Sequence, residues 1–356
     1  MATVTSGLRG FLRRAPAMLL MLWVASTAHA WSGHSMVTWE ALAPLPQLAA
    51  LQVPAESLEH FAQAEAPALQ TVLAGHEAWA RAQLPDYAPR PDDLAFRADA
   101  TRPSARDRLL LALRLNPFAR LPLFRQLRPG EALPPGREGL PWNAVTALAS
   151  GIGARAFRYV GLAEGENVSA LDVLASAAAE PDYGLDLSLF ADSGTPHGAR
   201  FGFGAQPFGN AKVDYASQAP FHMGFHHEAR IVFAAAGFLK RTQTEARVAL
   251  FSALARHAFA SGHAYWGYRF TGWALHYVQD LTQPYHARVL PGVGVARMLA
   301  INALAMAGWQ GPKNAAITRV SNRHTVVENY QVRRMAQALD AGRRDDALLA
   351  ALRDTA

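Results

Sequence analysis

The chain has 356 residues, of which 51% are hydrophobic and 17% are charged, and its formal net charge is +6. It contains no cysteine, which excludes disulfide bonds and leaves only nitrogen and oxygen ligands for a metal ion. Removing Arg9, Arg13 and Arg14 with the first 30 residues would lower the charge to +3, which is too small to indicate a nucleic-acid-binding protein.

The first 30 residues have the pattern of a secretory signal peptide. The three arginines precede an apolar run over residues 15–25, which is too short to span a bilayer comfortably. Ala28-His29-Ala30 is a small-x-small cleavage site. We therefore expect residues 1–30 to be removed and the protein to be secreted or periplasmic, with Trp31 as its new N-terminus.

The rest of the chain, residues 31–356, is predicted to be one all-α domain, because alanine and leucine dominate and alternating strand patterns are rare. The expected helices cover 35–43, 57–66, 68–83, 106–115, 142–161, 168–179, 225–240 and 245–279. Segments 84–104 and 184–220 are rich in proline or glycine and are expected to be loops, the second an ordered active-site loop.

The stretch 276–286 carries three metal-ligand side chains at useful spacings. His276 and Asp280 are four residues apart, which places them on one face of a helix. Pro284 cannot continue that helix, so the chain should turn just before His286. The two carboxylate oxygens of Asp280 can bridge two ions, and His286 can reach the second. The stretch therefore predicts a cluster of metal ions.

Two further pairs supply similar ligands. The free α-amine and the carbonyl oxygen of Trp31 form a five-membered chelate, and His34 is close enough to add an imidazole. His324 and Glu328 are again one helical turn apart.

Four features in this chain order resemble the trinuclear zinc enzymes: the N-terminal Trp31, the nearby His34, the stretch 276–286, and the pair His324 and Glu328. That superfamily joins the bacterial zinc-dependent phospholipases C with the secreted single-strand-specific nucleases of fungi and plants. The motifs span residues 31–328, although the segments between them match poorly. The resemblance implies a multi-helix single domain of the zinc-dependent phospholipase C type with three Zn²⁺ ions per chain. Because the span from Trp31 to Asp182 is unusually long for this superfamily, residues within 45–150 are expected to be an N-terminal helical insertion or a rebuilt substrate wall.

The resemblance also implies an aspartate and a histidine upstream that bind one zinc together with His276 and Asp280. Asp182 is the candidate aspartate, with the alternative that Asp182 or Asp186 only caps or turns the chain. For the histidine, His222 is preferred over His226 and His227. The full expected ligand set is Trp31, His34, Asp182, His222, His276, Asp280, His286, His324 and Glu328.

The chemistry implied by the resemblance is hydrolysis of a phosphodiester. A water bridging two zinc ions has its pKa lowered and attacks the phosphorus. Asp182 would bind zinc and also orient or deprotonate that water, and the ion held by Trp31 and His34 would stabilise the leaving alkoxide. Because the ligands must be deprotonated, activity should fall in acid.

The substrate is less clearly indicated than the metals. Glu328 and His276-Tyr277 resemble the phospholipases, whereas Thr282-Gln283-Pro284 and the short spacing from Trp31 to His34 resemble the nucleases. Six aromatic residues of the loop and its C-terminal continuation would either stack single-stranded bases or line a pocket for diacylglycerol. They are Phe201, Phe203, Phe208, Tyr215, Phe221 and Phe225.

We predict a phospholipase C-like enzyme that acts on a glycerophospholipid or another phosphodiester. A single-strand-specific nuclease is the alternative, and an exported, non-catalytic metal-binding protein is a third class. The apolar stretch 293–307 contains Arg297 and Asn302, so a helix packed into the core is favoured over a membrane span. Its alternative is an interfacial helix in peripheral contact with a membrane, which would suit a lipid substrate.

Overall fold

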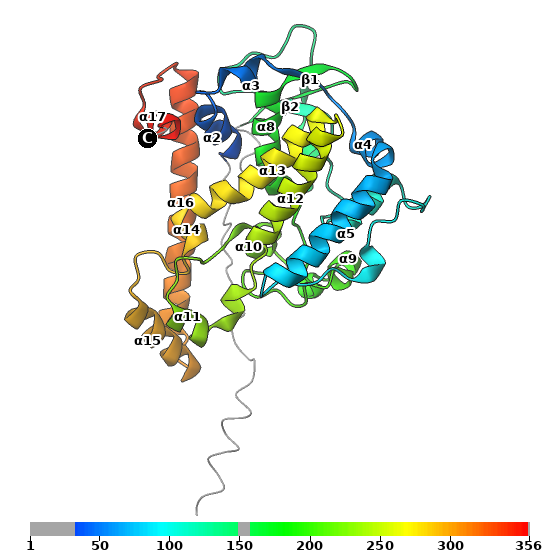
Figure 1. Cartoon of the computed structure of the whole chain (residues 1–356). Helices are drawn as coiled ribbons and strands as arrows, with labels where there is room; N and C mark the ends of the chain where they lie inside the picture. Colours follow the sequence, from blue (N-terminus) through cyan, green and yellow to red (C-terminus); the bar gives the residue numbers. More distant parts are fainter. Residues whose placement is uncertain (1–32, 149–156, 355–356) are drawn as a thin grey trace, which may run out of the picture.

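The computed structural model describes residues 33–148 and 157–354, and this part of the chain is mostly helical with a few short strands (Figure 1). The α-helices are α2 (His34–Ala41), α3 (Pro46–Ala50), α4 (Leu58–Ala64), α5 (Ala66–Gln83), α6 (Ala105–Ala112), α7 (Trp142–Val145), α8 (Ala170–Ala179), α9 (Pro196–Arg200), α10 (Asp214–His222), α11 (Arg230–Ala235), α12 (Thr244–Ala260), α13 (Ala264–Thr282), α14 (Pro284–Ala287), α15 (Val295–Met306), α16 (Gly311–Asp340) and α17 (Ala347–Arg353). Short 3₁₀ turns are η1 (Asp92–Leu94), η3 (Pro181–Tyr183), η4 (Ala191–Ser193) and η5 (Gly237–Lys240).

The strands form two small antiparallel sheets. In the first, β1 (Gln52–Pro54) pairs with β5 (Asn167–Ser169), and Val53 lies opposite Val168. In the second, β4 (Tyr159–Gly161) lies between β2 (Phe124–Gln126) and β3 (Gly139–Leu140). The sheets connect residues 45–148 to the segment that leads into α8. Whether residues 45–150 are an insertion stays a prediction.

The main core is built around α13, which packs against α12 on one side and α8 on the other (Figure 1). Its fully buried aromatic residues include Trp266, Phe270 and Trp273, which repeat at helical spacing on α13. Gly272 allows the close approach of α8, because a Cβ at that position would lie 2.6 Å from Cβ of Ala177. This packing fixes the position of the C-terminal half of α13.

Two smaller clusters flank the main core. The N-terminal helix α2 packs against α8 and α17, and a second cluster there contains Met36, Trp39 and Met335 of α16. A third cluster lies among α10, α11, η5 and α15, with Phe208, Phe225 and Val232 buried. The long helix α16 therefore contacts the body near α17 and approaches α15 at its other end (Figure 1).

Several predicted elements are confirmed and several are wrong. The helices expected at 35–43, 57–66, 68–83, 106–115 and 168–179 are present with small shifts. The single helix expected over 245–279 is wrong, because Ser261-Gly262 breaks it and Gly262 adopts a φ of 88°. The helix expected over 142–161 is present only as α7, and its end is strand β4; residues 149–156 lie outside the described ranges. The expected loop 184–220 contains α9 and most of α10.

The apolar stretch 293–307 forms α15, and its expected packing into the core is only partial: Val295 and Met298 pack against the third cluster. In α15 only Ala305 is buried, and the other side chains are half-buried or exposed. In the described part of the chain, no helix combines the length and apolar character needed to cross a membrane. The expected signal peptide, residues 1–30, and Trp31 lie outside the described residues.

Candidate metal centre

Eight of the nine predicted ligands are described, and the structure gathers all eight in one buried place. They come from six elements that are far apart in the sequence: His34 (α2), Asp182 (η3), His222 (α10), His276 and Asp280 (α13), His286 (α14), His324 and Glu328 (α16). Each is at most 7% exposed. Buried titratable side chains need partners, so such a concentration indicates a site that holds cations.

The local geometry of α13 and α14 follows the predicted pattern. Nε2 of His276 lies 3.2 Å from Oδ2 of Asp280, one helical turn away. The helix ends at Thr282, Gln283 is extended, and Pro284 begins the short helix α14. This turn brings Nδ1 of His286 to 3.0 Å from Oδ1 of Asp280. The two oxygens of Asp280 therefore face different histidines, as a bridging carboxylate requires.

The described side chains form three groups, each of which could hold a metal ion. Within each group the potential ligand atoms lie within 4.8 Å of one another. The groups are His34, Asp182 and His276; His222, His276 and Asp280; and His286, His324 and Glu328. The first two share His276, and Asp280 links the second to the third. Three ion sites with shared ligands are compatible with the predicted cluster, and nitrogen and oxygen donors suit zinc.

The first group contains His34 but does not test its expected pairing with Trp31. His34 was expected to act with Trp31, which lies outside the described residues. In the structure, Nε2 of His34 lies 3.6 Å from both Asp182 and Asp280, and its ring packs at 3.9 Å from that of His276. His34 therefore belongs with ligands of the central helix, because the buried helix α2 lies against α8 beside α13.

Of His222, His226 and His227, only His222 lies beside the other candidate ligands. It is 2% exposed, and its Nδ1 lies 2.9 Å from both Nε2 of His276 and Oδ2 of Asp280. His226 and His227 are exposed, and His226 faces Glu245 at 3.6 Å. The helix α10 ends at His222, so the chain leaves the site before the other two histidines.

Unsatisfied acceptors support the presence of a cation at these groups. Within the described part of the chain, neither carboxylate oxygen of Asp182 accepts a hydrogen bond, and Oε2 of Glu328 also accepts none. Both residues are nearly inaccessible to water. Burial raises the pKa of Asp182 to about 7 in the metal-free protein. A bound cation would satisfy these oxygens and lower that pKa.

The histidine rings are held by hydrogen bonds from their other nitrogen. Nδ1 of His276 donates to the carbonyl of Ala178 at 2.7 Å, and Nδ1 of His286 donates to the carbonyl of His222 at 2.9 Å. In a neutral ring each Nε2 then carries a lone pair that faces the cluster. Nε2 of His286 lies 3.0 Å from Nε2 of His324, so the two lone pairs converge on one point. Burial lowers the pKa of His34 well below its ordinary value, which keeps that ring neutral.

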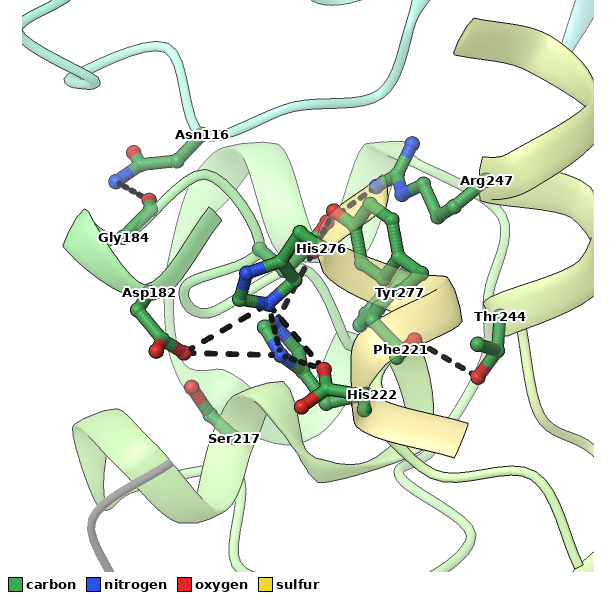
Figure 2. A network of polar contacts seen from close by, with 12 residues as sticks. Asn116, Asp182, Gly184, Ser217, Phe221, His222, Thr244, Arg247, His276 and Tyr277 are labelled. Carbon is green, nitrogen blue, oxygen red and sulfur yellow. Dashed lines mark hydrogen bonds and ion pairs between the residues drawn. The ribbon is translucent and has the colours of Figure 1, made fainter. Parts of the chain in front are cut away.

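A supporting carboxylate at Asp186 was missed by the sequence prediction. Arg247 donates to one of its oxygens at 2.6 Å, and the hydroxyl of Tyr277 donates to the other at 2.6 Å. The second oxygen also lies 3.5 Å from Nε2 of His222. Figure 2 shows His222 and His276 converging beside Asp182, with Arg247 and Tyr277 on the far side. Burial alone would raise the pKa of Asp186, but Arg247 lowers it, so the carboxylate stays ionised and orients His222.

A second buried ion pair fixes the helices that carry the ligands. Glu180, at the end of α8, accepts hydrogen bonds from Arg269 at 2.6 Å and from the indole of Trp273 at 2.5 Å. Both partners lie on α13, one and two turns before His276. No single-sequence pattern pairs Glu180 with residues about 90 positions later, so sequence reasoning had no means of finding this contact.

An apolar cavity of about 260 Å³ opens beside the third ligand group. Its wall includes His222, His286 and His324 at one end and residues of α11, α15 and α16 elsewhere. Tyr215 also lines it, whereas Phe201, Phe203 and Phe221 are buried in the main core and do not form a stacking surface. The site therefore combines buried metal ligands with an apolar chamber.

The structure thus defines the class: a mostly α-helical protein in which three buried groups of His, Asp and Glu could hold metal ions. No protein-family model, curated protein or solved structure matches the chain.

Proposed function

We propose that the chain is a secreted or periplasmic, zinc-dependent phosphoric diester hydrolase of the phospholipase C type, with the corresponding helical fold. The observation that carries the proposal is that eight buried ligand side chains adjoin an apolar cavity lined by His222, His286 and His324. A phosphodiester with an apolar substituent fits such a site, because its phosphate would reach the ligands while its apolar part fills the cavity.

Each ligand group has a distinct role in this proposal. The first two groups would hold two ions, with His276 binding only one of them because its Nδ1 donates to the carbonyl of Ala178; the third group, on α14 and α16, would hold the ion nearest the cavity. Zinc supplies a Lewis acid that neutralises phosphate charge and lowers the pKa of a water molecule. Asp182, with oxygens that accept no hydrogen bond within the described residues, orients the attacking water and accepts its proton. Asp186 and Arg247 act through His222 by holding its ring.

A lipid is favoured over single-stranded nucleic acid as the substrate. Base stacking requires exposed aromatic platforms along a basic groove. Phe201, Phe203, Phe208, Phe221 and Phe225, which were candidates for that role, are all buried. Phe208 and Phe225 instead line the cavity together with aliphatic side chains of α11, α15 and α16, and such an apolar wall suits an acyl chain.

The test is a parallel assay on phosphatidylcholine vesicles, single-stranded DNA and bis-p-nitrophenyl phosphate. We expect hydrolysis of the lipid and of the chromogenic diester, and a loss of about 100-fold or more in Asp280→Asn, because that substitution removes the bridging carboxylate. Asp92→Asn is the matched control, since the side chain of Asp92 is fully exposed.

Three outcomes of this assay would contradict the proposal in different ways. Cleavage of single-stranded DNA with inert vesicles would identify the nuclease alternative. Hydrolysis of the chromogenic diester alone would support a metal-dependent phosphodiesterase and exclude a phospholipid as its substrate. Equal rates for the wild type and Asp280→Asn on all three substrates would identify a non-catalytic metal-binding protein.

A further inference from the structure

The end of α16 that is remote from α17 forms a lobe with α15 and α11, which pack against each other (Figure 1). Exposed apolar side chains of this lobe lie on α11, at the end of α15 and just before α16. At the turn between α15 and α16, Met306 is 75% exposed and Trp309 is 70% exposed. Ile231 on α11 is 53% exposed. Large apolar side chains that are this exposed on one lobe mark an interaction surface rather than ordinary surface variation.

The same lobe is positively charged. Residues 281–327 contain Arg288, Arg297, Lys313, Arg319 and Arg323 but no aspartate or glutamate. Arg297, Arg319 and Arg323 are exposed, and none of them forms an ion pair with another described residue. Exposed apolar side chains beside unpaired arginines are typical of a surface that binds an anionic membrane.

The cavity connects this surface to the ligands. Met298, Leu299 and Ile301 of α15 line the cavity, and His286 and His324 line it at the metal centre. Lys313 also lines it, is only 8% exposed, and has no ion-pair partner among the described residues. Lysine in such a position extends its amine towards a polar boundary while its methylenes cover apolar surface. A lipid held at the lobe would therefore have an apolar path to the metal centre.

We propose that the α15–α16 lobe docks the protein on an anionic phospholipid bilayer. Trp309 and Met306 enter the interfacial region, while the exposed Arg297 and Arg319 bind lipid phosphates. The choice of a bilayer rests on the proposed phospholipase function, but the docking itself requires no hydrolysis. It predicts that the protein prefers anionic bilayers even when its substrate lipid is zwitterionic.

The test is sedimentation of the zinc-loaded chain with vesicles of phosphatidylcholine alone or with 30% phosphatidylglycerol. We expect at least tenfold stronger binding to the anionic vesicles. Trp309→Ala should weaken this binding about tenfold, and the pair Arg297→Glu and Arg319→Glu should abolish the preference for anionic lipid. Trp79→Ala is the matched control, because Trp79 is 44% exposed on α5, outside the lobe.

All variants should hydrolyse bis-p-nitrophenyl phosphate at the wild-type rate, since that substrate is soluble and the substituted residues are outside the ligand groups. The docking proposal is overturned if the wild type binds neither vesicle, or binds both equally, or if Trp79→Ala weakens binding as much as Trp309→Ala does. It is also overturned if the wild type is a dimer that Trp309→Ala converts to a monomer, because the lobe would then bind a second copy. Vesicle binding without lipid hydrolysis would contradict the proposed phospholipase function but would still support membrane docking through the lobe.

Discussion

Asp182, His222 and His286 carry protons in the metal-free protein that a zinc ion must displace. Burial raises the pKa of Asp182 to about 7. For His222, burial would lower the pKa, but Asp186 and Asp280 outweigh it and raise the pKa to about 10. For His286, burial would lower the pKa, but Asp280 and Glu328 outweigh it and raise the pKa well above its ordinary value. Zinc binds only the deprotonated forms, so its binding must release protons wherever the pH lies below these values.

Zinc affinity should therefore rise with pH. For each proton that zinc must displace, the apparent zinc affinity falls roughly tenfold per pH unit below the pKa of that group. We expect the logarithm of the affinity to rise with a slope of about 3 between pH 5.5 and 7, where Asp182, His222 and His286 are protonated, and with a slope lower by about 1 once Asp182 has ionised above pH 7.5. Competition with a chromogenic chelator measures this slope.

The matched variant for this experiment is Asp182→Asn, which cannot ionise. Below pH 7 its slope should be lower than the wild-type slope by about 1, because residue 182 no longer releases a proton while His222 and His286 still do. A wild-type affinity that is independent of pH from 5.5 to 9 would contradict the assigned ligands.

At the scale of elements, the position of α13 depends on its contact with α8. A Cβ added at Gly272 would lie 2.7 Å from the carbonyl oxygen of Leu174 and 3.1 Å from the amide of Ala178, the residue whose carbonyl oxygen accepts the hydrogen bond from His276. Backbone atoms cannot move aside as a side chain does. A larger residue at this position must therefore separate α13, which carries His276 and Asp280, from α8, which supplies the carbonyl that holds His276.

We predict that Gly272→Ala destabilises the fold by about 1–3 kcal/mol through this overpacking and weakens zinc binding. The matched control is Gly75→Ala in α5, where an added Cβ meets nothing within 4 Å. That change should be neutral or stabilise by about 0.5–1 kcal/mol, since alanine favours a helix. Urea unfolding with and without zinc compares the two. Equal stability of the two variants would show that the α8–α13 contact does not position the site.

Local spacing predicted the elements whose ligands are close in sequence. The helical pair His276 and Asp280, the break at Pro284 and the pair His324 and Glu328 all follow from backbone geometry within one or two turns. The break at Gly262 was missed because apolar residues continue on both sides of it with helical spacing. The short strand β4 was missed because its pairing with β2 and β3 depends on segments that precede it by many residues.

At the scale of the whole molecule, the long-range contacts could not be predicted from one sequence. Nothing in the local pattern indicates that Arg247 pairs with Asp186 or that Arg269 pairs with Glu180. The two partners are 61 residues apart in the first pair and 89 residues apart in the second. The same limit applies to α15, whose apolar composition favoured burial. Its exposure follows from its place at the end of α16, where few other elements are near enough to cover it (Figure 1).

The measurement that tests the account most directly is a zinc titration of the metal-free chain beginning at Trp31, with hydrolysis of bis-p-nitrophenyl phosphate as the readout. We predict that activity rises with added zinc and saturates at three ions per chain, and that Met placed before Trp31 removes one of them, because it displaces the terminal amine. A chain that binds no zinc, or that binds zinc and hydrolyses no diester at any loading, would contradict the assignment of a trinuclear phosphodiester hydrolase.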